Sequence, residues 1–138
     1  MKTLYVVTSG SYSAYGIDAI FDSRELAQAF IDGFKSGGWK DFNKIEEWEL
    51  NPNEAELKAS RKAFNLRMNK EGQIKSVEHS NSAYEHKYGL SISFTINADW
   101  MHVYCFADDE QHAIKIANEK RTQILALNRW GQNNPLSN

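Results

Sequence analysis

The side chains best suited to contact another molecule gather in one loop near the start of the chain. Residues 8–16 read Thr-Ser-Gly-Ser-Tyr-Ser-Ala-Tyr-Gly, so two phenol rings lie among small polar residues and two glycines. Glycines let a backbone approach a partner closely, and tyrosines supply rigid contact area with a polar tip. The loop has no lysine, which argues against a phosphate-binding loop of the Walker A type. We expect either a binding surface or a structural connection whose tyrosines pack on a sheet, and the candidate contact residues are Ser9, Ser11, Tyr12, Ser13 and Tyr15.

A second candidate surface is a run of acidic residues. Residues 46–56 contain five glutamates and no basic residue, whereas residues 58–75 carry six basic residues against Glu71 alone. This asymmetry has two interpretations, a solvated rim with local ion pairs or an acidic edge that faces a basic protein. In the second, the contacting carboxylates are Glu46, Glu47 and Glu49; in the first, glutamates of residues 46–56 pair with Lys58, Arg61 or Lys62.

Residues with catalytic potential do not form a known constellation. The four histidines match neither HExxH nor a Cys/His zinc spacing: His79, His86, His102 and His112. Glu78 and Glu85 each precede a histidine, but neighbouring side chains in a strand point to opposite faces. Cys105, the single cysteine, lies in an apolar strand pattern and is expected to be buried rather than catalytic. The sequence therefore predicts a protein that is not an enzyme, with no metal site and no cofactor.

The elements that position these residues follow from hydrophobic periodicity. Apolar or alternating runs predict strands at residues 2–8, 17–21, 45–50, 64–69, 73–78, 90–96 and 100–106. Helical spacing predicts one helix after Asp22, ending at Gly37 and Gly38, and a longer one at residues 108–127. Asp22 and Asp108 are the expected helix caps, and Ala113, Ile116, Ala117, Ile124 and Leu127 form the apolar stripe of the second helix.

This order of elements predicts an α+β fold. We expect a single antiparallel or mixed sheet of about five to seven strands with two main helices packed on it. Residues 1–138 are interpreted as one domain, and residues 131–138 as a flexible tail, because that segment is polar.

Composition limits the possible surroundings and partners. The chain has 138 residues, 41% hydrophobic and 25% charged, with a net charge of −2, which is typical of one globular domain. That charge provides no general attraction for duplex nucleic acid or an anionic membrane. No run approaches the roughly 20 apolar residues that span a bilayer, and one cysteine cannot form an internal disulfide. We therefore expect a cytoplasmic protein.

The opening of the chain resembles a group of small phage and prophage proteins. The resemblance rests on the segment YVVTSGSYSAYGIDAIF, a capped helix after it and the strand that contains Glu-Glu-Trp-Glu, and it covers roughly residues 1–50. It implies an accessory protein of a phage or mobile element that acts in the bacterial host cytoplasm. The group brings no assigned activity, so the resemblance implies a setting rather than a chemistry.

Three functions are consistent with these observations. The first is a binding protein that inhibits or modulates a bacterial host protein or complex, for example a defence system, through the tyrosine loop and the glutamates. The second is a protein that binds a small ligand or a signalling nucleotide, in which Arg121 and the basic residues near 58–75 matter. The third is an unrecognised small hydrolase. A homodimer is also possible through the polar face of the strand at 90–96, because a polar sheet face meets either water or a second subunit.

Overall fold

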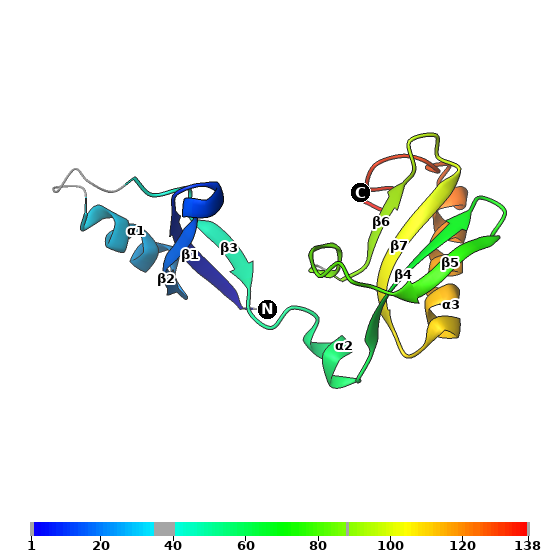
Figure 1. Cartoon of the computed structure of the whole chain (residues 1–138), viewed down its shortest axis with the longest axis horizontal. Helices are drawn as coiled ribbons and strands as arrows, with labels where there is room; N and C mark the ends of the chain where they lie inside the picture. The colour runs from blue at the N-terminus through cyan, green and yellow to red at the C-terminus, as the bar shows by residue number, and fades with distance from the viewer. Residues whose placement is uncertain (1, 35–40, 88, 138) are drawn as a thin grey trace. The chain divides into compact units, whose positions relative to one another are not determined.

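A computed structural model describes residues 2–34, 41–87 and 89–137, so Gly37 and Gly38 lie outside the described residues. The helix predicted to end at these glycines already ends at Asp32, so its predicted end is wrong. Within the described residues, seven strands form two antiparallel sheets, one of three strands and one of four. The chain divides into two compact units, here named unit 1 (Met1–Asn51) and unit 2 (Pro52–Asn138) (Figure 1). The expected α+β class is confirmed, but the expected single sheet is wrong. The interpretation of residues 1–138 as one domain stays a prediction.

Unit 1 is built around a central strand. β1 (Thr3–Ser9) pairs with β2 (Gly16–Phe21) on one side and with β3 (Glu46–Glu49) on the other. Val6 and Val7 are both fully buried, which confirms the central strand that the apolar run predicted. Within the described residues, no later strand pairs with this sheet. Local alternation identifies a strand but not its distant partner, and for this reason the sequence pattern did not reveal two sheets.

Helix α1 (Arg24–Asp32) covers one face of that sheet. Its cap is Ser23 rather than the expected Asp22, because the Ser23 hydroxyl accepts the amide N–H of Leu26 at 3.2 Å. Phe30 of the helix packs on Phe21 of β2, with ring centroids 5.6 Å apart. The aromatic contact anchors the helix to the strand that follows the tyrosine loop.

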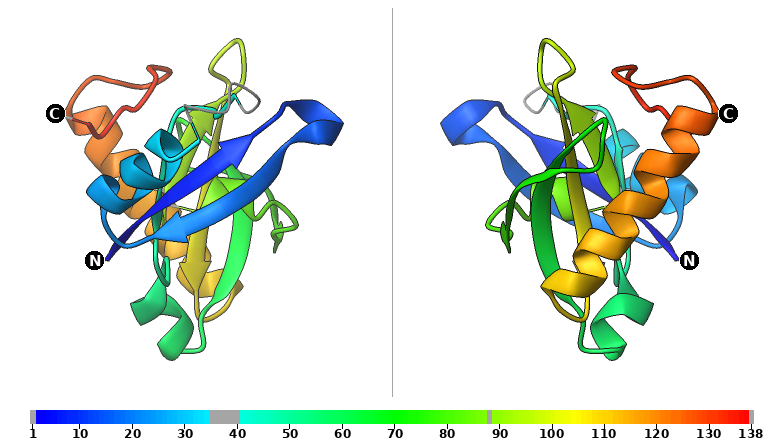
Figure 2. Two further views of the ribbon diagram at one scale, coloured as in Figure 1. Left: turned by 90° about the vertical axis from the view of Figure 1, so that its left-hand side faces the viewer. Right: turned by 90° about the vertical axis from the view of Figure 1, so that its right-hand side faces the viewer.

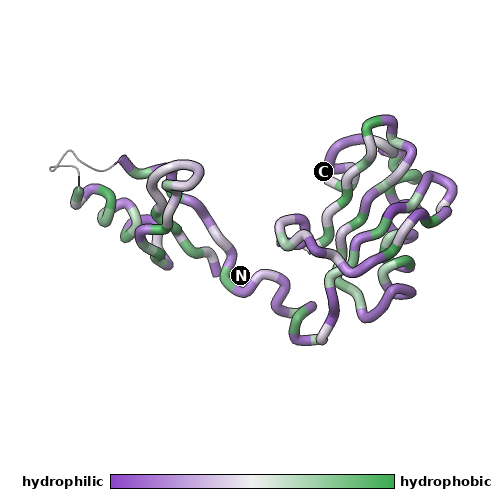
Figure 3. Tube along the Cα trace, in the orientation of Figure 1, coloured by the Kyte–Doolittle hydropathy of each residue, from purple (hydrophilic) through white to green (hydrophobic). Residues whose placement is uncertain are grey.

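Unit 2 contains a four-stranded sheet with the order β5-β4-β7-β6. The strands are β4 (Lys62–Asn69), β5 (Ile74–His79), β6 (Ser91–Phe94) and β7 (Trp100–Ala107). Along β4 and β7 every second residue is buried, and the same alternation in hydropathy runs along the tube in Figure 3. The buried residues pack against α3 (Glu110–Ala126), which crosses this face of the sheet (Figure 2, right). The strands expected in this half of the chain are confirmed, but the strand expected at residues 90–96 is shorter, because Leu90 and Ile96 are exposed beyond its two ends.

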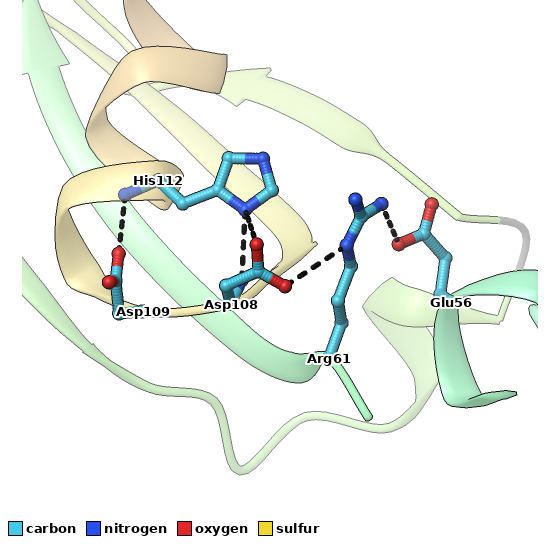
Figure 4. Close-up of polar contacts among 5 residues, drawn as sticks. All are labelled: Glu56, Arg61, Asp108, Asp109 and His112. Carbon is cyan, nitrogen blue, oxygen red and sulfur yellow. Dashed lines mark hydrogen bonds and ion pairs between the residues drawn. The ribbon is translucent and has the colours of Figure 1, made fainter. Parts of the chain in front are cut away.

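A chain of charged side chains links α2 (Glu54–Lys58) to the start of α3. The carboxylate of Asp109 caps α3 by accepting the N–H of His112 at 2.8 Å, so the cap expected at Asp108 is wrong by one residue. Asp108 instead accepts a hydrogen bond from Arg61 at 3.3 Å, and Arg61 also donates to Glu56 at 2.9 Å (Figure 4). Glu56 and Arg61 thus form the local ion pair that one interpretation of the charge pattern predicted.

The apolar face of α3 is narrower than the periodicity predicted. Ala113, Ala117 and Ile124 are fully buried and Ile116 is partly buried, whereas Leu127 is exposed because it lies just beyond the helix end.

No helix within the described residues is long and apolar enough to cross a membrane.

The residues after α3 are held by polar and apolar contacts. The Arg129 guanidinium donates to the carbonyl oxygens of Pro135 at 3.3 Å and Ser137 at 2.8 Å. Leu136 packs against the core of unit 2. These contacts involve residues 135–137, which belong to the segment that the sequence predicted to be a flexible tail.

Candidate functional site

The tyrosine loop has a defined shape that depends on one glycine. Gly10 has a φ of +79°, and a Cβ atom placed on it would lie 2.2 Å from the carbonyl oxygen of Ala14. Only glycine therefore allows the turn η1 (Tyr12–Ala14) to fold back over the loop. Asn43 holds the opposite side, because its amide donates to the Gly10 carbonyl at 2.9 Å and to the Thr8 hydroxyl at 3.2 Å. The loop is a built feature rather than a loose connection.

Tyr12 is displayed by this loop. Its side chain is 98% exposed, so it does not pack on the sheet as a structural tyrosine would. Its φ of +49° lies in the left-handed region, which costs a residue with a Cβ atom about 1–2 kcal/mol. Ser11 and Ser13 on either side are also exposed, while Ser9 is partly buried at the end of β1. An exposed aromatic on strained backbone is a feature that structural need alone does not explain.

Tyr15 and Glu46 meet, as the hypothesis of a joint surface requires. The Tyr15 hydroxyl donates to the Glu46 carboxylate at 2.5 Å, and this hydrogen bond is the main reason that the pKa of Tyr15 is raised. Glu47, the next residue in β3, points to the opposite face of the sheet, where it pairs with Arg24. Arg24 also lies over the Tyr5 ring, 5.2 Å from its centroid. Alternation along β3 therefore splits the predicted acidic edge between two faces.

Glu49 lies on the Glu47 side of β3, opposite Thr3 of β1. Of the basic residues at 58–62, Lys58 pairs with Glu54 at 2.9 Å within unit 2. The structure brings together Tyr15 and Glu46 among the predicted site residues, and it places Tyr12 in solvent on the turn beside them.

Sequence reasoning identified only one strand of a polar surface in unit 2, the strand at 90–96. The face of its sheet that α3 leaves uncovered carries polar side chains in two rows across all four strands, here named the polar face. Strand register places Ser76, Arg67, His102 and Ser93 in one row, and Glu78, Asn65, Tyr104 and Ser91 in the next. Alternation along the strand at 90–96 predicted its polar side but not the residues beside it, because residues that share a row come from distant parts of the sequence.

Arg67 and His102 are the central pair of the polar face. Arg67 is partly buried, and no hydrogen bond or ion pair joins its guanidinium to a residue that the structure describes. The Tyr104 hydroxyl lies 3.1 Å from Nδ1 of His102, and the two rings are tilted by 36° with centroids 4.2 Å apart. Burial, followed by the charge of Arg67, lowers the pKa of His102, against a smaller opposing effect of Glu85 and Glu78.

His86 is the most unusual residue beside the polar face. It belongs to η3 (Tyr84–His86) and is only 4% exposed, and its two ring nitrogens have no hydrogen-bond partner among the described residues. Its ring packs edge-on against Tyr104 and Phe106, with centroids 5.6 and 5.3 Å away. Burial lowers the pKa of the imidazole. His86 also lines a pocket of about 670 Å³ together with Ala63 and Phe106.

The other residues considered for chemistry have structural contacts. Burial raises the pKa of the Cys105 thiol to about 11, so it stays protonated near neutral pH and is a poor nucleophile. The Arg121 guanidinium donates to Asn118 and to the Lys70 carbonyl, and it thereby holds the β4–β5 turn. No group of three histidine, cysteine or acidic residues in the described ranges is arranged to hold a metal ion.

The chain matches no protein family, and the comparisons with curated proteins and with solved structures found no match either.

Proposed function

We propose that this chain is an accessory binding protein of a phage or mobile element, which inhibits or modulates a bacterial host protein or complex by direct contact through the tyrosine loop. The observation that carries the proposal is Tyr12, a 98% exposed aromatic held on left-handed backbone. Tyrosine is enriched among the few residues that dominate binding energy, because it buries a large area with little loss of side-chain freedom.

The surroundings of Tyr12 support a preformed contact surface. Gly10 and Asn43 fix the loop before any partner arrives, which lowers the entropy cost of association. The hydrogen bond between Tyr15 and Glu46 places a carboxylate beside the loop. A partner with a basic patch next to an apolar pocket is the best match, since opposite charges speed encounter and the pocket receives the ring.

Site-specific photocrosslinking tests this proposal. A benzophenone amino acid is introduced at Tyr12 in one variant and at Ile96 in another, and each is irradiated in a bacterial lysate. Ile96 is the matched control because it is also a fully exposed apolar residue on a turn, in the other unit. We expect a discrete crosslinked protein from position 12 that is absent from position 96. Identical patterns from both positions, or no crosslink at position 12, would contradict the proposal.

A further inference from the structure

One row of the polar face consists of hydrogen-bond donors. Ser76, Arg67, His102 and Ser93 lie side by side on β5, β4, β7 and β6. Neighbouring strands are about 4.8 Å apart, so these side chains are close enough for adjacent members to reach one bound group. If the Tyr104 phenol donates to Nδ1 of His102, the imidazole proton lies on Nε2 and adds a further donor to the row. The row therefore suits a group that only accepts hydrogen bonds.

Arg67 gives this row its charge. No hydrogen bond or ion pair joins the Arg67 guanidinium to a described residue, so its five N–H donors are available to a ligand. Guanidinium groups match the oxygen atoms of phosphate and carboxylate in bidentate geometry. The unused donors of Arg67 thus point to an oxyanion as the missing partner.

An aromatic ring lies next to the donor row. Trp100 is two residues from His102 on the same face of β7, which is about 7 Å along the strand. The Lys75 ammonium lies over the Trp100 ring, 5.3 Å from its centroid, and brings a second positive charge to this end of the polar face. An indole is a sequence-tolerant stacking surface for a nucleobase. Phosphate recognition and base stacking are therefore available within the length of one nucleotide.

The acidic residues limit how much negative charge the ligand can carry. Glu78 lies in the next row of the polar face. Ser91 belongs to the same row as Glu78, and its hydroxyl donates a hydrogen bond to Glu85 at 3.4 Å. A nucleic-acid strand that crossed both rows would bring phosphates beside these carboxylates, which is unfavourable. A ligand with one phosphate at the Arg67 end avoids this repulsion.

We propose that the polar face of unit 2 binds a nucleoside monophosphate, with its phosphate on Arg67 and His102 and its base on Trp100. This site lies in unit 2 and uses none of the residues of the tyrosine loop, so it goes beyond the partner-binding function.

Calorimetric titration of the full chain tests the assignment. The probes are the four common nucleoside 5′-monophosphates, the corresponding nucleosides and inorganic phosphate. We expect at least one monophosphate to bind with a Kd below about 1 mM, and nucleosides and inorganic phosphate to bind at least about tenfold more weakly. Failure of every monophosphate to bind, or equal affinity for inorganic phosphate, would overturn the assignment.

Matched variants locate the site. Arg67→Gln removes the charge but breaks no hydrogen bond or ion pair with a described residue, and should weaken monophosphate binding at least about tenfold. Lys62→Gln removes an exposed positive charge from the same strand and should leave the affinity unchanged. Equal affinities for the wild type and Arg67→Gln would place the ligand elsewhere and end the proposal. Loss of binding here would leave the crosslinking result at Tyr12 unaffected, so the two proposals fail separately.

Discussion

Replacement of His86 by leucine should stabilise the protein. The His86 ring is almost fully buried between Tyr104 and Phe106, and neither nitrogen has a hydrogen-bond partner among the described residues. An unsatisfied buried polar group costs about 1–3 kcal/mol, and an apolar side chain of similar size removes that cost. Both ring nitrogens are unsatisfied, so the gain is about 2–6 kcal/mol. Each of the two edge-on ring contacts is worth about 0.5–1.5 kcal/mol, so their loss offsets about 1–3 kcal/mol of it. We expect His86→Leu to raise the free energy of unfolding by about 1 kcal/mol.

The same substitution at another histidine provides the control. Nδ1 of His112 accepts the backbone N–H of Asp108 at 2.9 Å, so His112→Leu leaves a donor without its acceptor. That variant should lose about 0.5–1.5 kcal/mol. Urea unfolding followed by circular dichroism measures both changes. In thermal unfolding, a gain of 1 kcal/mol corresponds to a rise in Tm of about 4–8 °C for a unit of this size. A His86→Leu variant that is less stable than the wild type would refute the reasoning, because it would mean that the imidazole makes a favourable polar contact.

Three further predictions concern pH, the loop and the core. The free energy of unfolding should fall when the pH is lowered from 7.5 to 5.5, because burial lowers the pKa of His86 and His102 and the unfolded chain then binds protons that the folded chain does not. Urea titrations at both pH values measure this free energy, and a rise on acidification would contradict the prediction. Gly10→Ala should lower stability by at least about 1–2 kcal/mol, since its φ is positive and its Cβ would collide with the loop; an unchanged melting curve would count against the loop geometry. Ile124→Ala should cost about 2–5 kcal/mol and the exposed Leu127→Ala less than about 0.5 kcal/mol; equal losses in chemical denaturation would contradict the assigned face of α3.

Much of the local structure follows from the sequence. The run at Leu4–Val7 indicated a central strand, and alternation at 64–68 indicated a strand with one buried face. The helix caps were each misplaced by one residue, to Asp22 and Asp108, because a serine or aspartate at the next position satisfies the same amide groups. Capping chemistry therefore locates a helix start only to within a residue or two.

Some of the candidate site residues could be recognised from the sequence, and others could not. The tyrosine loop could be recognised because its composition is local, and Tyr12 and Gly10 are neighbours in sequence. The polar face could not, because Arg67 and His102 are brought together by the pairing of β4 with β7. The lack of hydrogen-bond partners at His86 is likewise a property of packing that no residue pattern encodes. Alternation shows that a strand has a polar side, whereas strand register decides which polar side chains meet there.

The central claim is that Tyr12 is kept exposed on strained backbone in order to bind a partner, and Tyr12→Gly tests it most directly. Glycine adopts a positive φ without strain, so this variant should fold with a Tm equal to or above that of the wild type, despite a modest cost from the freer unfolded chain. Its affinity for the protein crosslinked through position 12, measured by surface plasmon resonance, should fall at least about tenfold, as expected for the loss of an aromatic anchor. A Tyr12→Gly variant that binds this protein with wild-type affinity would contradict the account.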